Sequence, residues 1–332
     1  MRSIRQSLRK RLIDRRNKVL SADLRLILEG NGVTLVDIGA AGGLQDRWQP
    51  FTKSVDLVAV EPDPRALETI EELETATLKS LHRINSPLAE KAGEVEFFLC
   101  KHPRQSSVLR PNPVHFEKYH DGHKWEVVET IRLNAMRLDD ALLPRIKADF
   151  LKLDTQGSEL GILRGSELVL ESCLGIEVEV EFREMYLKQP LFGDVADFLT
   201  SKNLDFIDFV AFGKWERSRP DGLRTFLGEL IHADALFLRS PDAVVGAAVR
   251  SGDKIQLIKY LAILYIYSRS DMLRATLCQA KENRLLTPEY LTQLTQKTER
   301  IDDRLHKYQS RLNLLSGLTS WTGPELRFNV AS

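Results

Sequence analysis

Residues 33–48 read VTLVDIGAAGGLQDRW, in which a short apolar run ends at an acidic residue and passes directly into a glycine-rich turn. Asp37 is the acid, and Gly39, Gly42 and Gly43 belong to the turn. In α/β proteins a buried strand, a glycine turn and a helix bring backbone N–H groups close to a bound cofactor. The stretch therefore predicts a cofactor site at the carboxyl end of a sheet, with a helix following the turn.

The region around this turn has the rhythm of an α/β protein. Short apolar runs alternate with helical patterns from residue 33 to about residue 240, which predicts a βαβ sheet of seven main strands with helices on both faces. The strands are expected at residues 34–38, 57–60, 79–84, 149–153, 175–182, 204–211 and 233–239.

Two other regions depart from this rhythm. Residues 94–100 and 126–133 are β-rich and lie between the third and fourth main strands, so we expect an inserted hairpin or edge pair. Residues 243–315 contain few Gly or Pro and repeat with helical periods, which predicts a helical appendage. We expect three domains: a basic N-terminal helix (1–30), an α/β domain (31–240) and a helical C-terminal appendage (241–332).

The charge of the chain is balanced overall but not locally. With 47 Lys and Arg against 47 Asp and Glu, no global field favours nucleic acid, so we predict no nucleic-acid partner. Residues 1–18 hold eight basic residues against Asp14, with Ile4, Leu8 and Leu12 on one helical face. One hypothesis is peripheral contact of this helix with an anionic membrane. The alternative is a helix packed on the core with its charges in water.

The three cysteines indicate a reducing cellular compartment. Cys100, Cys173 and Cys278 are far apart and form no CxxC spacing, which is typical of reduced thiols. No apolar run approaches the roughly 20 residues that span a bilayer. We therefore predict a cytoplasmic protein, and the membrane hypothesis for residues 1–18 places it at the inner face of the membrane.

The residues around the turn discriminate between two cofactors. Proteins that bind a nicotinamide dinucleotide usually carry a GxGxxG motif, and its pyrophosphate lies on a helix N-terminus. This chain has GAAGG instead, and the charge of Asp37 next to it would repel a pyrophosphate. S-adenosylmethionine carries an ammonium and a sulfonium, which a carboxylate attracts. Glu61, about 20 residues further on at the end of the next strand, suits the ribose hydroxyls of either cofactor.

Five segments together carry a family resemblance. They are VDIGAAGG (36–43), VAVEPDP (58–64), INSPLAEKAGEVEFFL (84–99), VETIRLNAMRLDDAL (128–142) and DFLKLDTQGSELGILRG (149–165). Over about residues 33–240 the chain resembles the FkbM family of S-adenosylmethionine-dependent methyltransferases. The resemblance implies the Rossmann-like class I methyltransferase fold and O-methylation of a sugar hydroxyl on a glycan, glycolipid or other natural product. Mapped onto this chain, it predicts cofactor contacts at Asp37, Gly39, Ala40, Gly42, Glu61, Pro62, Ser86 and Asp154.

One position departs from the family pattern. Where that pattern usually reads D-x-E-G-x-E, this chain has Asp154, Gln156, Gly157 and Glu159. A glutamine can form hydrogen bonds but cannot take up a proton or serve as an anionic ligand. We therefore assign Gln156 to substrate contact rather than to proton transfer.

Methyl transfer to oxygen needs a group that aligns the acceptor hydroxyl and removes its proton. Asp154 ends the fourth strand beside the expected crevice, and Glu159 follows in the first helical turn. We predict both as catalytic. For Glu159 the alternative is an acid that complements the helix dipole.

The run GIEVEVEF alternates strictly, which places Glu177, Glu179 and Glu181 on one face of a strand. Burying three carboxylates is costly unless they have partners, so the later ones should emerge at the open end of the sheet. Glu179 and Glu181 are predicted to bind the acceptor, with Tyr186 as an apolar wall. A solvated face or salt bridges to helix lysines is the alternative.

Three histidines form a weaker signal. His115, His120 and His123 have spacings that fit a polar surface loop better than a metal site, so we predict no metal. A lid carrying a histidine base is a second interpretation. A nicotinamide-dependent oxidoreductase and a non-catalytic binding module stay open as alternatives, and the C-terminal helices are predicted to mediate homo-oligomer formation.

Overall fold

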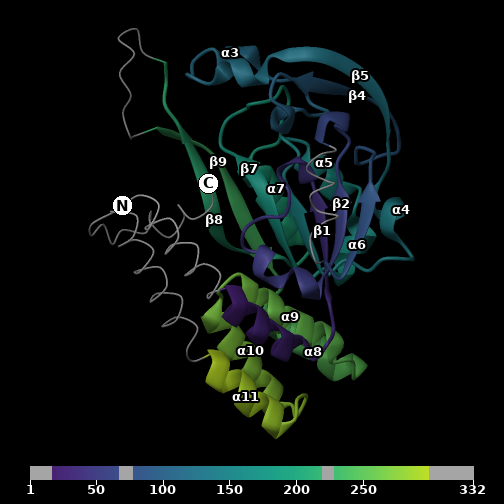
Figure 1. Cartoon of the computed structure of the whole chain (residues 1–332), viewed down its shortest axis with the longest axis vertical. Coiled ribbons are helices and arrows are strands. Elements are labelled where there is room, and N and C mark those ends of the chain that lie inside the picture. Colours follow the sequence, from purple (N-terminus) through teal and green to yellow (C-terminus); the bar gives the residue numbers. More distant parts are fainter. Residues whose placement is uncertain (1–16, 67–77, 219–227, 299–332) are drawn as a thin grey trace. The chain divides into compact units, whose positions relative to one another are not determined.

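The computed structural model describes residues 17–66, 78–218 and 228–298, which fall into two compact units (Figure 1). Unit 1 takes its described residues from segments 17–33, 45–55 and 240–298. Unit 2 takes its described residues from segments 34–44, 56–66, 78–218 and 228–239. The chain therefore passes from one unit to the other several times.

A seven-stranded sheet dominates unit 2, with the strand order β3-β2-β1-β6-β7-β9-β8. The pairs β1–β6, β2–β3 and β6–β7 are parallel, whereas β9 is antiparallel to both β7 and β8. The strands are β1 (Val33–Ile38), β2 (Val55–Val60), β3 (Ser80–Ile84), β6 (Phe150–Leu153), β7 (Gly175–Glu181), β8 (Asp205–Trp215) and β9 (Glu229–Leu238). The predicted Rossmann-like sheet of seven main strands is confirmed.

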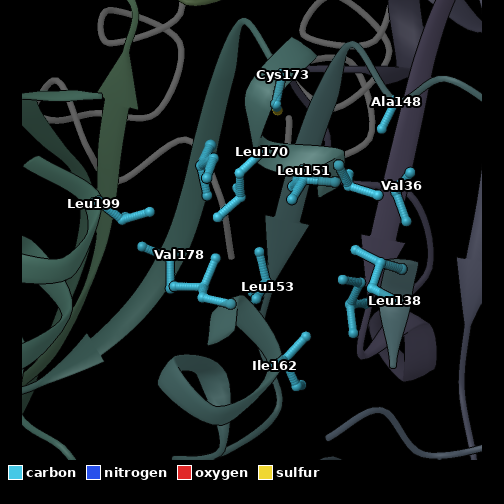
Figure 2. Close-up of a cluster of buried hydrophobic side chains, with 14 of the residues drawn as sticks. Val36, Leu138, Ala148, Leu151, Leu153, Ile162, Leu170, Cys173, Val178 and Leu199 are labelled. Atoms are coloured by element: carbon cyan, nitrogen blue, oxygen red, sulfur yellow. The ribbon is translucent and has the colours of Figure 1, made fainter. Parts of the chain in front are cut away.

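One face of this sheet forms the apolar core of unit 2. Successive side chains of a strand point to opposite faces of the sheet, so Val36, Leu151, Leu153 and Val178 lie on the same face. Figure 2 shows them in one cluster with Leu199 and other side chains from the helices. The helices on this face are α4 (Leu138–Leu142), α5 (Glu159–Arg164), α6 (Glu167–Ser172) and α7 (Phe192–Ser201). Burial of this face holds the strand ends in place.

The predicted β insert is also confirmed. β4 (Gly93–Cys100) and β5 (Val127–Ala135) pair antiparallel as a separate two-stranded sheet. The segment between them, near the top of Figure 1, contains the short elements η4 (Pro103–Gln105), α3 (Pro113–Phe116) and η5 (Gly122–Trp125). Within it the rings of Phe116 and Trp125 stack at 4.6 Å.

The prediction of a helix directly after the glycine turn is wrong. Two 3₁₀ turns follow β1 instead, η1 (Ala40–Gly42) and η2 (Gln49–Ser54), and a third, η3 (Pro64–Ala66), follows β2. Gly43, directly after η1, has a φ of 73° and a ψ of −179°, which lies outside the helical region, so the turn does not continue as a helix. A glycine turn without a following α-helix offers no helix N-terminus for a pyrophosphate.

The last two strands are longer than predicted. β8 continues to Trp215, and β9 begins at Glu229 rather than at residue 233. The added residues pair with each other, Lys214 with Leu230 and Trp215 with Glu229. In an antiparallel edge pair, polar side chains can face solvent, so charged residues do not end the strand.

Unit 1 is helical. Residues 17–28 form a helix, and the C-terminal segment supplies α8 (Pro241–Ser251), α9 (Ile255–Ile266), α10 (Ser270–Glu282) and α11 (Pro288–Thr298). The helical pattern expected after residue 240 is confirmed up to residue 298. Residues 1–16, which carry most of the predicted basic helix, lie outside the described residues.

Unit 1 has its own buried contacts. The buried carboxylate of Asp23 lies 2.8 Å from the Lys297 ammonium and accepts a hydrogen bond of 3.1 Å from the Tyr265 hydroxyl. The ring of Trp48 meets that of Tyr267 edge-on at 6.1 Å. Across the three described stretches, no helix has the length and apolar character required to cross a bilayer.

Candidate active site

A pocket opens at the carboxyl ends of β1, β2 and β6, where an α/β sheet is expected to bind its ligand. The turns after these strands, the loop after β3, and η4 from the β insert contribute to its wall. The lining residues include Gly39, Gly42, Glu61, Pro62, Arg104, Gln105, Asp154, Gln156 and Glu179.

Gly39 fixes the turn after β1 against the end of β6. Its N–H donates to the carbonyl of Val60 at 2.9 Å, while the N–H of Asp154 donates to that of Ile38 at 2.9 Å. Gly39 has a φ of 87°, and a Cβ there would lie 1.9 Å from the Asp154 carbonyl oxygen. Only glycine fits this position.

Glu61 presents a fixed carboxylate to the pocket. Its two oxygens accept hydrogen bonds from the N–H groups of Ala41 at 2.9 Å and Asp63 at 2.8 Å. Burial raises the pKa of Glu61 to about 7. Because a carboxylate has about four acceptor sites, it retains capacity for the hydroxyls of a ligand.

The ion pair of Asp63 with Arg65 links the turn after β2 to the β insert. The guanidinium of Arg65 lies 2.6 Å from Asp63 and also donates to the Cys100 carbonyl and the Ser106 hydroxyl, both at 2.9 Å. This bridge holds η4 beside the pocket, which explains why a loop from the insert forms part of its wall.

Beneath the turn a row of buried charges crosses the sheet. Asp37, Lys152 and Glu177 are aligned in register on β1, β6 and β7, so their side chains share one face. The Lys152 ammonium lies 3.2 Å from Asp37 and 3.5 Å from Asp154. Burial raises the pKa of Asp37 to about 6. Burial alone would lower the pKa of Lys152, but both carboxylates raise it above its usual value.

Gln156 joins the two acids that face the pocket. Its amide donates to Asp154 at 3.1 Å and to Glu179 at 2.7 Å, and its oxygen accepts a 2.9 Å hydrogen bond from the Tyr186 hydroxyl. Burial alone would raise the pKa of Asp154, but the Lys152 ammonium lowers it below the usual range. Burial raises the pKa of Glu179 to about 8.

His232 on β9 completes this network. Its Nδ1 lies 2.9 Å from the second oxygen of Glu179. Burial alone would lower the pKa of His232, but the adjacent Glu179 carboxylate raises it to about 9. The paired residue on β8 is Gly213, where a Cβ would lie 1.9 Å from the imidazole Nε2. A glycine in the neighbouring strand thus makes room for the ring.

The structure brings together part of the predicted site. Among the predicted residues, those that line the pocket are Gly39, Gly42, Glu61, Pro62, Asp154, Gln156 and Glu179. The remaining predicted residues, which are not part of the lining, are Asp37, Ala40, Ser86, Glu159, Glu181 and Tyr186. Ser86 precedes Pro87, which does line the pocket.

Glu159 holds the loop after β6. Its carboxylate accepts hydrogen bonds from the N–H of Thr155 at 2.6 Å and from the Thr155 hydroxyl at 3.0 Å. It is buried at the start of α5, and burial raises its pKa to about 7. The side chain therefore acts on the conformation of the loop that carries Asp154 and Gln156.

The acidic face of β7 is enclosed. Glu177, Glu179 and Glu181 are 1%, 8% and 4% exposed, so the solvated-face alternative is wrong, and Glu181 does not emerge at the open end. Burial, together with the charges of Glu159 and Glu179, raises the pKa of Glu181 well above its usual value. Tyr186 is also buried rather than an open wall.

The three histidines of the insert are not among the residues that line the pocket. Burial lowers the pKa of His115. Within the described ranges there is no group of three or more His, Cys, Asp or Glu residues placed to hold a metal ion.

Sequence reasoning missed four residues of the site. Lys152 was visible as the one cation inside the apolar strand DFLKL, and that was a usable signal for a buried ion pair. Arg104, Gln105 and His232 gave no such signal, because only the folded chain brings the β insert to this pocket and His232 of β9 to Glu179.

Among the comparisons with known proteins, the match to a family model shows the family. The family described as methyltransferase FkbM domain matches residues 37–207, slightly more than half of the chain. No curated protein matches. Similar solved structures include a precorrin-6y C5,15-methyltransferase from Geobacter metallireducens, with 10% identity, a TM-score of 0.35, and coverage of 67% of this chain and 88% of that one. A putative tRNA (m1A22) methyltransferase from Streptococcus pneumoniae, in complex with S-adenosyl-L-methionine, has 11% identity, a TM-score of 0.30, and coverage of 83% and 98%.

Proposed function

This chain belongs to the FkbM methyltransferase family, and from that premise we propose that it transfers a methyl group from S-adenosylmethionine to a hydroxyl of a sugar on a glycan, glycolipid or other natural product. The observation that carries the proposal is the pocket at the ends of β1, β2 and β6, where three carboxylates from different strands, Glu61, Asp154 and Glu179, face one space.

The side chains of this pocket fit S-adenosylmethionine. Carboxylates attract its ammonium and sulfonium, and Glu61 is placed for the ribose hydroxyls. The buried Oε1 atom of Gln105 has no hydrogen-bond partner among the described residues, so a bound ligand can donate to it. When bound, S-adenosylmethionine supplies an electrophilic methyl group.

Asp154 is the residue that we assign to the acceptor hydroxyl. Its side chain is 38% exposed at the pocket, and the Lys152 ammonium keeps it ionised. An ionised carboxylate accepts a short hydrogen bond from a hydroxyl, orients it, and takes up its proton as the oxygen reacts. Glu159 assists by fixing the Thr155 loop that carries Asp154.

Gln156 keeps two acids in adjacent positions. By donating to both Asp154 and Glu179 it holds their oxygens toward one pocket without adding a third charge. Sugar hydroxyls can bridge such a pair because carboxylates accept several short hydrogen bonds. A sugar acceptor therefore fits the arrangement better than an apolar one.

The two alternatives differ from this proposal in measurable ways. A nicotinamide-dependent oxidoreductase needs a helix N-terminus for its pyrophosphate, whereas β1 leads into the three-residue η1. A non-catalytic module would bind the cofactor without turnover, and only an assay separates it from an enzyme.

The test is binding followed by transfer. We expect S-adenosylmethionine and S-adenosylhomocysteine to raise the melting temperature of the chain, while NAD does not. Incubation with [methyl-³H]S-adenosylmethionine and a panel of free sugars, glycans and glycolipids should then label a hydroxyl, located by NMR of the product. A label on nitrogen or carbon would contradict O-methylation, and cofactor binding with no labelled product across the panel would favour the non-catalytic module.

A further inference from the structure

We propose that Arg104, on η4 of the β insert, binds the carboxylate at the methionine end of S-adenosylmethionine. The inference rests on the proposed function, because it names a residue for the same cofactor. Nothing in the motifs of the sequence marks Arg104. Its position in the folded chain does.

The charges around the pocket are unequal. Among the described residues that line it, the carboxylates are Glu61, Asp154 and Glu179, and Arg104 is the one basic side chain. S-adenosylmethionine brings an ammonium and a sulfonium, which the carboxylates can oppose, together with one carboxylate, which they would repel. The anionic end of the cofactor therefore needs the guanidinium.

Arg104 lies over the turn where the amino-acid end of the cofactor is expected. The position that a Cβ would take at Gly42 is 3.9 Å from Cζ of the Arg104 guanidinium. Gly42 is the last residue of η1, and Gly39 starts the same turn. Because Gly42 has no side chain, the guanidinium faces the turn directly, and a carboxylate can reach it there.

The base of this loop is fixed while the Arg104 side chain is not engaged. Ser106 accepts hydrogen bonds from Arg65 at 2.9 Å and from the Cys100 N–H at 3.2 Å, and the Ser107 hydroxyl donates to the Gln156 carbonyl at 2.9 Å. In the part of the chain that the structure describes, Arg104 has neither an ion-pair nor a hydrogen-bond partner. The guanidinium of Arg104 can therefore pair with the carboxylate of the cofactor.

The other cations near the pocket are already paired. Lys152 contacts Asp37 and Asp154, and Arg65 contacts Asp63. Neither can turn to a ligand without leaving a buried carboxylate unpaired, which is costly. Among the described residues that line the pocket, Arg104 is therefore the cation that can bind the cofactor carboxylate.

The experiment compares two ligands that differ only in that carboxylate. Isothermal titration calorimetry would measure S-adenosylhomocysteine and its decarboxylated analogue, S-adenosyl-3-thiopropylamine, on the full chain and on Arg104→Gln. A hydrogen bond to a charged group contributes about 1.5–3 kcal/mol. We therefore expect the variant to bind S-adenosylhomocysteine roughly 10- to 150-fold more weakly, with little change for the analogue.

Two further variants sharpen the result. Arg104→Lys keeps the charge but not the forked geometry, so it should recover part of the affinity. Arg110→Gln removes an exposed arginine of the same segment that is not part of the pocket lining, and it should leave both affinities unchanged.

Three outcomes overturn the assignment. Unchanged affinity of Arg104→Gln for S-adenosylhomocysteine would show that the cofactor carboxylate lies elsewhere. Equal losses for both ligands would show that the substitution disturbs the pocket rather than one contact. Binding of neither ligand by the unaltered chain would contradict the proposed function itself, a result that the first two outcomes do not produce.

Discussion

At position 39 the backbone leaves no room for a side chain, because the Asp154 carbonyl occupies the place of a Cβ. Gly39→Ala must therefore move either the turn after β1 or the end of β6. A positive φ costs a non-glycine residue a further 1–3 kcal/mol or so. We expect a clearly lower melting temperature and loss of S-adenosylhomocysteine binding, measured by differential scanning fluorimetry and calorimetry.

Gly161→Ala is the matched control for that change. Gly161 lies within α5, where an added Cβ would meet nothing within 4 Å, and alanine favours a helix over glycine by about 1 kcal/mol. The melting temperature should stay the same or rise. If Gly39→Ala bound cofactor as well as Gly161→Ala does, the turn would not be part of the cofactor site.

Asp154 carries the second prediction at this scale. Asp154→Asn keeps the shape of the side chain but removes the charge that would take up the acceptor proton. Turnover should fall by about 10²- to 10⁴-fold, whereas S-adenosylhomocysteine affinity changes little. The measurement is methyl transfer to whichever acceptor the panel identifies.

Gln156→Ala should reduce turnover less, because it removes hydrogen bonds to Asp154 and Glu179 but leaves both acids in place. Should the two variants rank the other way, the proton would leave by another route. Glu179, paired with His232, is then the next acid to replace.

At the scale of elements, the antiparallel pair β8–β9 brings a titrating group to the site. His232 on β9 faces Glu179 of β7, with Asp234 on its own strand, Asp154 after β6, and Trp215 and Gly213 on β8. The pKa of His232 is raised to about 9 and that of Glu179 to about 8. Both groups therefore hold their protons to higher pH in the folded chain than in the unfolded one.

The sign of the pH dependence follows from that difference. Stability from His232 is fully present below its unfolded pKa of about 6.5 and is lost as pH rises through 9. Each extra proton on the folded state gives a slope of up to about 1.4 kcal/mol per pH unit. We expect the free energy of unfolding, from urea titrations at pH 6.5 to 9.5, to fall with pH.

Two variants test whether this pair is the source of the slope. His232→Gln removes the titrating ring, and Gly213→Ala places a methyl group where the ring now lies. Both should flatten the slope. An unchanged slope in His232→Gln would assign it to other groups.

The same elements show how far the sequence could be interpreted. The strands of the core and the β insert were predictable, because residues such as Val36, Leu151 and Val178 follow the period of two that a buried face imposes. The helix after Gly43 was mispredicted, since glycine turns of this kind are followed by a helix in many other proteins.

The site was predictable only where motif and strand end coincide, as at Gly39, Glu61 and Asp154. Arg104 reaches the pocket, and His232 reaches the pocket acid Glu179, from elements far away in sequence, and no periodicity encodes such long-range contacts. Burial of Glu181 was mispredicted, because the sequence does not show how far a strand is covered.

For the whole molecule, the two units do not correspond to a simple cut in the sequence. Segment 45–55 belongs to unit 1 together with the helices after residue 240. Trp48 and Phe51 are buried there, with their rings edge-on to Tyr267 and Tyr265. The C-terminal helices therefore supply the side chains that bury Trp48 and Phe51, although these two residues lie between β1 and β2 in the sequence.

A chain ending at residue 240 tests this dependence. Exposing two large aromatic side chains costs several kcal/mol, so we expect it to melt at a much lower temperature or to aggregate on size-exclusion chromatography. A chain ending at residue 298 keeps every described residue of unit 1 and is the control. A 1–240 chain that purifies as a monomer with the melting temperature of the control would contradict the expectation.

The basic segment 1–18 carries the last prediction at this scale. If it lies on an anionic surface, each basic residue near the surface contributes about 1 kcal/mol, and vesicles with 30% phosphatidylserine should co-sediment the full chain at low salt. A chain lacking residues 1–18 should stay in the supernatant. Equal sedimentation of both chains would refute the membrane hypothesis.

The way η4 is anchored has a practical consequence for enzyme engineering. Arg65 and Ser107 hold the two ends of this loop through backbone and hydroxyl groups, so its path does not depend on the side chains that face the pocket between them. Gln105 can therefore be randomised in a small saturation library, with Gly39, Asp154 and the anchors left unaltered. Screening such a library against sugars that the natural enzyme rejects would search for new acceptors without sampling variants that cannot fold.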